Sequence, residues 1–345
     1  MIQQDKLDRL GTHRVLDPKG VLPQVAWKLD NDCSKVHDNE LLIDVTTLNI
    51  DSASFREISE RAQGKAETIK SIIMKIVQDR GKMHNPVTGS GGVLAGRVEK
   101  IGTKAMKRIA VGDRIITLVS LSLTPLYLKD IFEIRPNAQI EVKGKAILFE
   151  SELCVKLPTD MSERLAVSVL DVAGASPQVA RLVRRGQTVI VLGGGKSGIL
   201  SLYAARKTLG KSGTLIALGR SNESVRRLKD TGWADIVIQG DATLPVEVFR
   251  SVSEVTNNQM ADVVVNCLNE PGTEMASILS CKEGGVVYFF NMATSFTAAT
   301  LGAEGIGKDI TMVMGNGYCH DHANFTLNLI RESQPLRTIF EESFV

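Results

Sequence analysis

Glycines with phosphate-binding spacing lie in residues 191–200, which read VLGGGKSGIL. Two signatures overlap in this segment. Gly195-Lys196-Ser197 matches the end of an ATP-type phosphate loop, whereas Gly193, Gly195 and Gly198 have the spacing of a dinucleotide-binding turn. Both would hold phosphate at the start of a helix, but one would serve phosphoryl transfer and the other hydride transfer.

The residues before the glycines favour the dinucleotide turn. An ATP-type loop needs a glycine five residues before Gly195, where the chain has Ile190. Ile190 lies in the apolar, β-branched run 188–192, which is typical of a buried strand. The glycines therefore begin where a strand ends, and residues 196–209 are expected to form the helix that follows. A glycine-rich turn without a ligand is the alternative.

Each glycine of this turn has an expected role. Gly193 permits the tight turn, Gly195 lets the backbone approach a pyrophosphate, and Gly198 lets the helix pack against the strand. Because ligands lie at the carboxyl ends of such strands, later loops are also expected to contact the cofactor. The expected cofactor residues are Gly193, Gly195, Lys196, Ser197, Gly198, Arg220, Ser221, Cys267, Leu268, Asn269, Asn291 and Met292.

The residues after the second strand favour NADP over NAD. NAD enzymes place an acid about 20 residues past the turn to bind the ribose hydroxyl. Here the strand ends at Leu218, and no acid follows until Glu223. Arg220 and Ser221 could instead bind a 2′-phosphate, and Arg226 or Arg227 could assist. Stacking of Arg220 on adenine, with both cofactors accepted, is the alternative.

The composition is that of an ordinary globular protein. The chain has 345 residues, 43% of them hydrophobic and 23% charged, with a net charge of +2. No basic stripe indicates nucleic-acid binding, and no apolar run approaches the ~18 residues of a membrane span. The N-terminus lacks the apolar region of a signal peptide. Five cysteines without a CxxC spacing predict reduced thiols and a cytoplasmic location.

The two halves of the chain have different patterns. From about residue 187, apolar strands alternate with helices, which predicts a doubly wound parallel sheet. Before about residue 157, short strands alternate with turns, and a helix at 67–78 has an isoleucine-rich core face. We therefore expect an α/β protein with a β-rich catalytic domain (1–160), a Rossmann dinucleotide-binding domain (161–315) and a C-terminal segment (316–345) that returns toward the catalytic domain.

Three short patterns are similar to the medium-chain dehydrogenase/reductase architecture. They are the strand and turn at 91–102, the turn Val111-Gly112-Asp113-Arg114, and Leu48-Asn49-Ile50-Asp51. The last resembles the zinc-free quinone-reductase branch, in which asparagine replaces the zinc-ligand cysteine. The resemblance implies a GroES-like first domain without metal. His320-Asp321-His322 is a possible metal motif, but we expect it to be solvated.

Longer segments carry a more specific resemblance. Gly11–Trp27, Gly302–Asp309 and Met314–Tyr318 resemble the L-erythro-3,5-diaminohexanoate dehydrogenase family of lysine fermentation. This resemblance runs from about residue 11 to 345. It implies NAD(P)-dependent oxidative deamination of (3S,5S)-3,5-diaminohexanoate to (S)-5-amino-3-oxohexanoate and ammonium. The architecture also implies a homodimer.

Such a substrate needs a general base, because the 3-ammonium must lose a proton before hydride can leave. Asp171 lies in an apolar segment and is expected to be buried, and Asp51 follows a strand beside Asn49. We expect Asp171, Asp51 and His84 to be catalytic, although a cap or an ion pair would explain either carboxylate. Glu150, Arg56 and Asn316 are expected to bind the substrate.

Two other functions fit the same fold. A zinc-free quinone or enoyl reductase would have a mostly apolar substrate site. A non-catalytic sensor would bind a dinucleotide without turnover. From the residues alone, the prediction is a nicotinamide oxidoreductase of unknown substrate.

Overall fold

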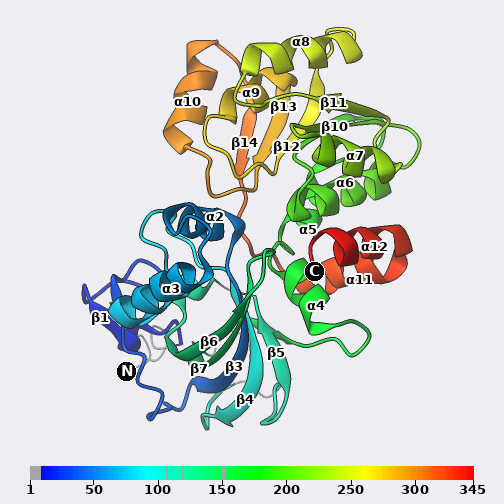
Figure 1. The fold of residues 1–345 in the computed structure, drawn as a ribbon. Coiled ribbons are helices and arrows are strands. Elements are labelled where there is room, and N and C mark those ends of the chain that lie inside the picture. The colour runs from blue at the N-terminus through cyan, green and yellow to red at the C-terminus, as the bar shows by residue number, and fades with distance from the viewer. Residues whose placement is uncertain (1–8, 106–107, 119, 150–152) are drawn as a thin grey trace. The chain divides into compact units, whose positions relative to one another are not determined.

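The computed structural model describes residues 9–105, 108–118, 120–149 and 153–345. The chain divides into two compact units, residues 1–171 and 172–345 (Figure 1). Each unit is built around its own six-stranded sheet. The fold class expected from the sequence, a parallel sheet with a separate β-rich part, is confirmed.

The first unit is an antiparallel sheet with helices packed beside it. Its strand order is β6-β7-β3-β4-β5-β8. The strands are β3 (Glu40–Asn49), β4 (Val93–Ile101), β5 (Arg114–Thr117), β6 (Leu126–Ile134), β7 (Gln139–Phe149) and β8 (Cys154–Lys156). The helices are α2 (Ser52–Arg61), α3 (Ala66–Arg80) and α4 (Glu163–Leu170). A short pair, β1 (Val15–Asp17) and β2 (Lys28–Leu29), precedes them.

The α3 helix forms where the sequence predicts it. Its isoleucines recur at helical spacing, and Ile69, Ile73 and Ile76 join the hydrophobic core of this unit. The helix ends at Gly81, whose φ of 67° is the left-handed geometry that favours glycine after a helix. The stripe is therefore core, as expected.

One strand is longer than the sequence indicates. Short strands at 139–142 and 146–149 are expected on either side of Gly144, but β7 runs through it unbroken. A Cβ at Gly144 would lie 2.4 Å from the carbonyl oxygen of Tyr127 on β6. The glycine therefore marks a close approach of two strands and not a turn.

The second unit is a doubly wound parallel sheet. Its order, β11-β10-β9-β12-β13-β14, reverses direction beside β9, as in dinucleotide-binding folds. The strands are β9 (Thr188–Leu192), β10 (Thr214–Gly219), β11 (Ile236–Gln239), β12 (Ala261–Asn266), β13 (Cys281–Phe289) and β14 (Thr311–Met314). The helices are α5 (Ala175–Leu182), α6 (Lys196–Leu209), α7 (Asn222–Asp230), α8 (Pro245–Val255), α9 (Glu274–Ser280), α10 (Phe296–Gly305), α11 (His322–Glu332) and α12 (Gln334–Ser343).

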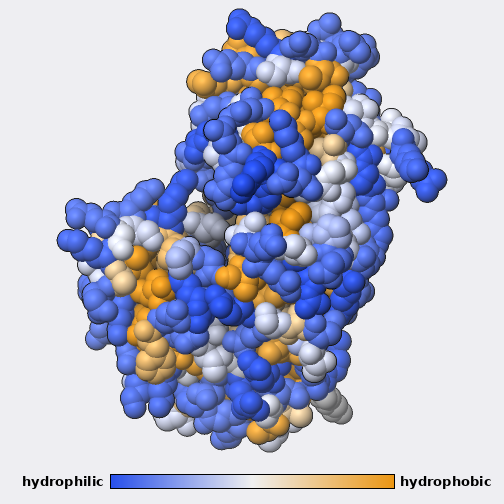
Figure 2. Space-filling model, turned by 45° about the vertical axis from the view of Figure 1, so that its right-hand side comes forward, coloured by the Kyte–Doolittle hydropathy of each residue, from blue (hydrophilic) through white to orange (hydrophobic). Residues whose placement is uncertain are grey.

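The C-terminal helices belong to this second unit. The α11 helix contacts α5, and α12 contacts α6, so the end of the chain covers the helix that follows the glycine turn (Figure 1). Lys207 on α6 forms an ion pair with Glu332 on α11. The surface in view in Figure 2 is mostly hydrophilic, with separate hydrophobic areas.

Candidate active site

The glycine turn has the geometry that a dinucleotide fold requires. Gly193 has a φ of 109°, which favours glycine, and its N–H donates to the carbonyl of Leu218. A Cβ at Gly198 would lie 1.9 Å from the carbonyl oxygen of Gly193. Both glycines are therefore required by the fold of the chain itself.

Gly195 is different, because the chain gives no reason for glycine there. Its φ of −81° suits any residue, and a Cβ at this position would meet no described atom within 4 Å. It is the N-terminal cap residue of α6 and provides no side-chain cap for the first N–H groups of this helix. Lys196 and Ser197 are half-buried in the first turn. The space and the helix N-terminus fit a pyrophosphate group.

Arg227 supports the turn and does not reach toward a ribose. Its guanidinium donates to the carbonyl of Gly194 at 2.9 Å and lies over the Phe344 ring at 4.9 Å. It also pairs with Glu223. The suggestion that Arg227 assists 2′-phosphate binding is therefore not favoured by its contacts.

Arg220 and Ser221 follow β10, as expected for residues near the adenosine end of a dinucleotide. Arg220 is 60% exposed, and its guanidinium lies 3.7 Å from Asp241 and 3.8 Å from Glu270. The Ser221 hydroxyl accepts from the N–H of Ser224 and caps α7. Arg220 is thus available to a ligand but is flanked by two carboxylates.

The loops after β12 and β13 are held by a buried asparagine that the sequence analysis missed. Asn266 donates to Thr273 and Ser277, and its Oδ1 accepts from Leu268 N–H and Asn291. These bonds hold Leu268 and Asn291 on the same side chain, and Leu268 lies beside the glycine turn, since a Cβ at Gly193 would meet it. The signal for Asn266 was only a polar residue at the end of an apolar strand.

The remaining loop residues differ in exposure. Burial raises the pKa of Cys267 to about 11, so this thiol stays protonated and is a poor nucleophile. Asn269 and Met292 are exposed at the surface of the second unit. Of the expected loop residues, the structure places Cys267 and Leu268 beside Gly193, and Asn291 beside Asn266.

In the first unit, polar side chains gather at the end of β3. Asn49 is the last residue of β3 and pairs with Gln139, the first residue of β7. Both side chains are completely buried. Asp51 caps α2, because its Oδ1 accepts from the Ser54 N–H at 3.0 Å. The backbone at Gly92 passes close to the end of β3, since a Cβ at Gly92 would lie 1.9 Å from the Asn49 carbonyl oxygen.

Three oxygens of this group are left over. Among the residues that the structure describes, Asn49 Oδ1, Asp51 Oδ2 and Gln139 Oε1 are buried and have no hydrogen-bond partner. The sequence indicated Asn49 and Asp51, but it gave no signal for Gln139, whose place depends on the β3–β7 register.

His84 is half-buried in the loop after α3. Burial is the main reason that its pKa falls to about 4, and the charges of Lys82 and Arg80 lower it further. Its Nδ1 is buried and has no partner within the described ranges. Lys82 is itself fully buried and donates to the carbonyls of Pro23 and Gln24. His84 is therefore neutral near pH 7 and only weakly basic.

Comparison with known proteins identifies the family. The family model of the L-erythro-3,5-diaminohexanoate dehydrogenase N-terminal domain matches residues 13–158. The chain is 52% identical over 341 residues to the L-erythro-3,5-diaminohexanoate dehydrogenase of Acetoanaerobium sticklandii, covering 98% of this chain and 99% of the relative. The enzyme of that name from Fusobacterium nucleatum is 51% identical, with the same coverage. The chain belongs to this family.

The fold is shared more widely than the family. The alcohol dehydrogenase TADH from Thermus sp. ATN1 is 19% identical, with a TM-score of 0.56, covering 88% of this chain and 85% of that one. This likeness concerns the fold alone. In the part of this chain that the structure describes, no helix is long and apolar enough to cross a membrane.

Residues implied by the family resemblance lie in different settings. Asp171 is half-buried and not buried as expected, because it follows the last turn of α4. Arg56 is exposed on α2, with its Nε 3.9 Å from Glu60. Asn316 is exposed and accepts from the Tyr318 N–H through its side chain. Glu150 lies outside the described residues.

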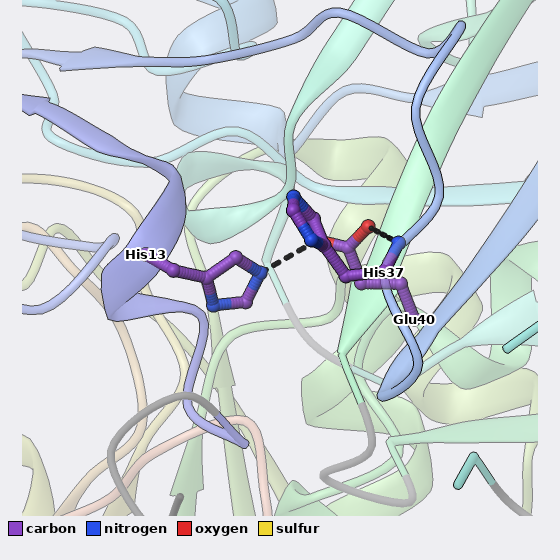
Figure 3. A group of neighbouring side chains, drawn as sticks. All are labelled: His13, His37 and Glu40. Carbon is purple, nitrogen blue, oxygen red and sulfur yellow. Dashed lines mark hydrogen bonds and ion pairs between the residues drawn. The ribbon is translucent and has the colours of Figure 1, made fainter. Parts of the chain in front are cut away.

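Three side chains that could in principle ligate a metal lie together near the start of β3 (Figure 3). His13, His37 and Glu40 each place one ligand atom within 4.8 Å of the others. However, the two Glu40 oxygens already accept four hydrogen bonds, from His13, the His37 N–H and twice from Arg14. A carboxylate has about four such sites. Glu40 is therefore committed to the chain and not to a cation.

Proposed function

We propose that this chain catalyses NAD(P)-dependent oxidative deamination of (3S,5S)-3,5-diaminohexanoate to (S)-5-amino-3-oxohexanoate and ammonium. The observation that carries the proposal is the 52% identity to an enzyme of that name along nearly the full length of both chains. The glycine turn adds independent support, because its open Gly195 fits a dinucleotide. A quinone or enoyl reductase is less favoured, since unpartnered polar oxygens suit neither apolar substrate.

The reaction sets separate tasks for the protein. The 3-ammonium must lose a proton to a base, hydride leaves C3 to the nicotinamide, and water adds to the resulting iminium to release ammonium. In total, the diamino acid, one water and one oxidised cofactor yield the ketone, ammonium, the reduced cofactor and a proton. The cofactor supplies the hydride acceptor, and the chain supplies the base and orients the substrate.

We assign Asp171 as the base. It is a half-buried carboxylate, and the close relatives imply chemistry on an amine. Asp171→Asn is expected to lower kcat by about two orders of magnitude, the usual contribution of acid–base catalysis, while cofactor affinity stays unchanged. Near-normal turnover in a folded variant would remove Asp171 from this role.

NADP is the proposed preferred cofactor, with Arg220 as the ligand of its 2′-phosphate. The exposed guanidinium supports this, although Asp241 and Glu270 reduce its net attraction for phosphate. Arg220→Ala is expected to lower the ratio of kcat/KM for NADP over NAD about tenfold. A wild-type preference for NAD, or an unchanged ratio, would contradict the role.

The setting of the reaction is part of the same proposal. Lysine degradation in the cytoplasm agrees with five free cysteines, which suit a reducing compartment. A homodimer is the proposed assembly, which sedimentation velocity would test.

The central experiment is a panel of substrates. Cofactor reduction is measured with 3,5-diaminohexanoate, and reduced-cofactor oxidation is measured with a quinone and with an enoyl thioester. We expect turnover with the diamino acid alone, with ammonium released in equal amount. Turnover only with the quinone or thioester would overturn the proposal, and cofactor binding without any turnover would indicate a sensor.

A further inference from the structure

Three hydrogen-bond acceptors at the end of β3 have no partner in the described part of the chain. They are Asn49 Oδ1, Asp51 Oδ2 and Gln139 Oε1. Buried polar atoms without partners are rare, because their lost hydration costs free energy. Three such atoms from neighbouring residues indicate a group that comes from outside the chain.

The three residues are neighbours at one end of β3. Asn49 and Gln139 are directly paired across β3 and β7, which places their side chains on the same face about 5 Å apart. Asp51 follows two residues after Asn49, beyond the end of the strand, as the extended cap residue of α2. Between them, Ile50 and Ile140 belong to the hydrophobic core. Asn49 and Gln139 therefore lie on the face opposite the core, and Asp51 follows at the end of the same strand.

The other polar atoms of these side chains already form hydrogen bonds within the chain, so only the three oxygens are available to a ligand. Gln139 donates its Nε2 to the carbonyl of Arg164 at 2.8 Å, so its amide oxygen points away from that bond. The second oxygen of Asp51 caps α2. Two neutral amide oxygens and one carboxylate oxygen are left, and all three can only accept.

The complement of such a site is a small cation with several donors. A primary ammonium has three N–H donors, no acceptor and one positive charge. A quinone or thioester carbonyl has no donor and would leave all three oxygens unsatisfied. We propose that Asn49, Asp51 and Gln139 form a binding site for a primary ammonium group.

This inference rests on the proposed function, and it assigns the site to the 5-ammonium of the substrate. Hydrogen bonds to a charged group favour its charged form, so this site holds the pKa of a bound ammonium high. The 3-amino group must instead become neutral before hydride leaves. The site suits the ammonium that keeps its proton, which makes Asp51 a binding residue and not the base.

The decisive test uses a ligand that cannot react at C3. Binding of (5S)-5-aminohexanoate and of hexanoate is measured by calorimetry on the NADP⁺-saturated enzyme. We expect the wild type to bind the amine at least about tenfold more tightly than hexanoate. Asn49→Leu removes one acceptor, and Asp51→Asn removes the charge but keeps a good helix cap. Each is expected to reduce that preference about tenfold.

Thr47→Val is the matched control. Thr47 lies on the same face of β3, two residues before Asn49, but its hydroxyl already has a partner in Glu163. It is expected to leave the preference for the amine unchanged. Circular dichroism and thermal unfolding check that all three variants are folded.

Kinetics with 3,5-diaminohexanoate give a second readout. Asn49→Leu and Asp51→Asn are expected to raise KM by about tenfold or more and to change kcat less, since they remove uniform binding. Equal wild-type affinity for 5-aminohexanoate and hexanoate, as when only water occupies the site, would overturn the inference. So would a preference that both variants retain, or a kcat loss with a shifted pH profile in Asp51→Asn. Selective amine binding without deamination would instead refute the proposed function and leave the ammonium site standing.

Discussion

Two buried asparagines end a strand in this molecule, and their surroundings are opposite. Asn266 ends β12 and uses both ends of its amide in four hydrogen bonds to its own chain. Asn49 ends β3, where its Oδ1 has no partner among the described residues and its Nδ2 is 3.5 Å from the Ile50 carbonyl. Both side chains are 0% exposed. The same residue type therefore has hydrogen-bond partners for its whole amide in one region and an oxygen without a described partner in the other.

The difference teaches how each region meets its ligand. Around the glycine turn, side chains form hydrogen bonds to one another, and Gly195 stays open for the cofactor that we propose binds there. At the end of β3, it is side-chain oxygens that have no partner in the described structure, and these form the proposed ammonium site. A pre-built backbone cradle suits a cofactor shared by many enzymes, whereas unpartnered side chains suit a particular substrate.

Replacing Asn266 should produce the largest loss of stability. Asn266→Leu would leave Thr273, Ser277, Asn291 and the Leu268 N–H without a shared partner in a buried place. Because each lost buried bond costs about 1 kcal/mol or more, we expect a loss of about 3–5 kcal/mol. Urea unfolding followed by circular dichroism measures it. A loss below about 1 kcal/mol would mean that the two asparagines do not differ as described.

Lowering the pH should test Glu40, a second buried side chain whose hydrogen-bond acceptors all have partners. It lies at the opposite end of β3 from Asn49. Burial alone would raise the pKa of Glu40, but hydrogen bonds from Arg14 and His13 outweigh it and lower the pKa from 4.5 to about 2. A lowered carboxyl pKa gives stability that is present above 4.5 and is lost as the pH falls toward 2. At about 1.4 kcal/mol per unit, the loss is about 3 kcal/mol.

The measurement compares unfolding free energies of the wild type and Glu40→Gln between pH 6 and pH 2. The gap between them should narrow as the pH falls below 4.5, because protonation removes the charge that the variant lacks. A gap that stays constant over this range would show that the charge of Glu40 is not what stabilises the fold.

Local patterns in the sequence were sufficient for the glycine turn. The expected strand 188–192 and helix 196–209 coincide with β9 and α6, because hydrophobic period and glycine spacing are properties of neighbouring residues. The break expected between strands 139–142 and 146–149, around Gly144, was wrong because the need for a glycine there is not local. The requirement comes from Tyr127 on another strand, which no local pattern contains.

The candidate site was only partly predictable. Asn49 and Asp51 stood out by position, but Gln139 did not, since its role depends on a strand pairing 90 residues distant along the chain. Asn266 was missed because its four bonds come from separate loops. The expected burial of Asp171 was wrong because apolar flanks say nothing about where a helix ends.

Alanine in place of two glycines sharpens the comparison within the turn. Gly198→Ala would place a Cβ 1.9 Å from the Gly193 carbonyl oxygen, so we expect a loss of about 1–3 kcal/mol and weaker cofactor binding. Gly195→Ala meets no atom of the chain and should change stability by less than about 0.5 kcal/mol. It should still weaken cofactor binding about tenfold, by occupying space that the pyrophosphate needs. Unfolding curves and fluorescence titration with NADPH separate these effects, and unchanged affinity in Gly195→Ala would show that the pyrophosphate does not lie there.

The smallest expected change in stability is also the one that most directly tests the contrast between the asparagines. Asn49→Leu removes a buried oxygen that has no partner in the described structure and adds apolar atoms beside Val93, its neighbour on β4. Replacing an unsatisfied polar group by an apolar one of similar size is nearly neutral or stabilising, so the free energy of unfolding should change by less than about 1 kcal/mol. Urea unfolding without ligands gives this value beside that of Asn266→Leu. A loss comparable to that of Asn266→Leu would mean that the Asn49 side chain is fully hydrogen-bonded in the ligand-free protein. The end of β3 would then have no acceptor available for a substrate.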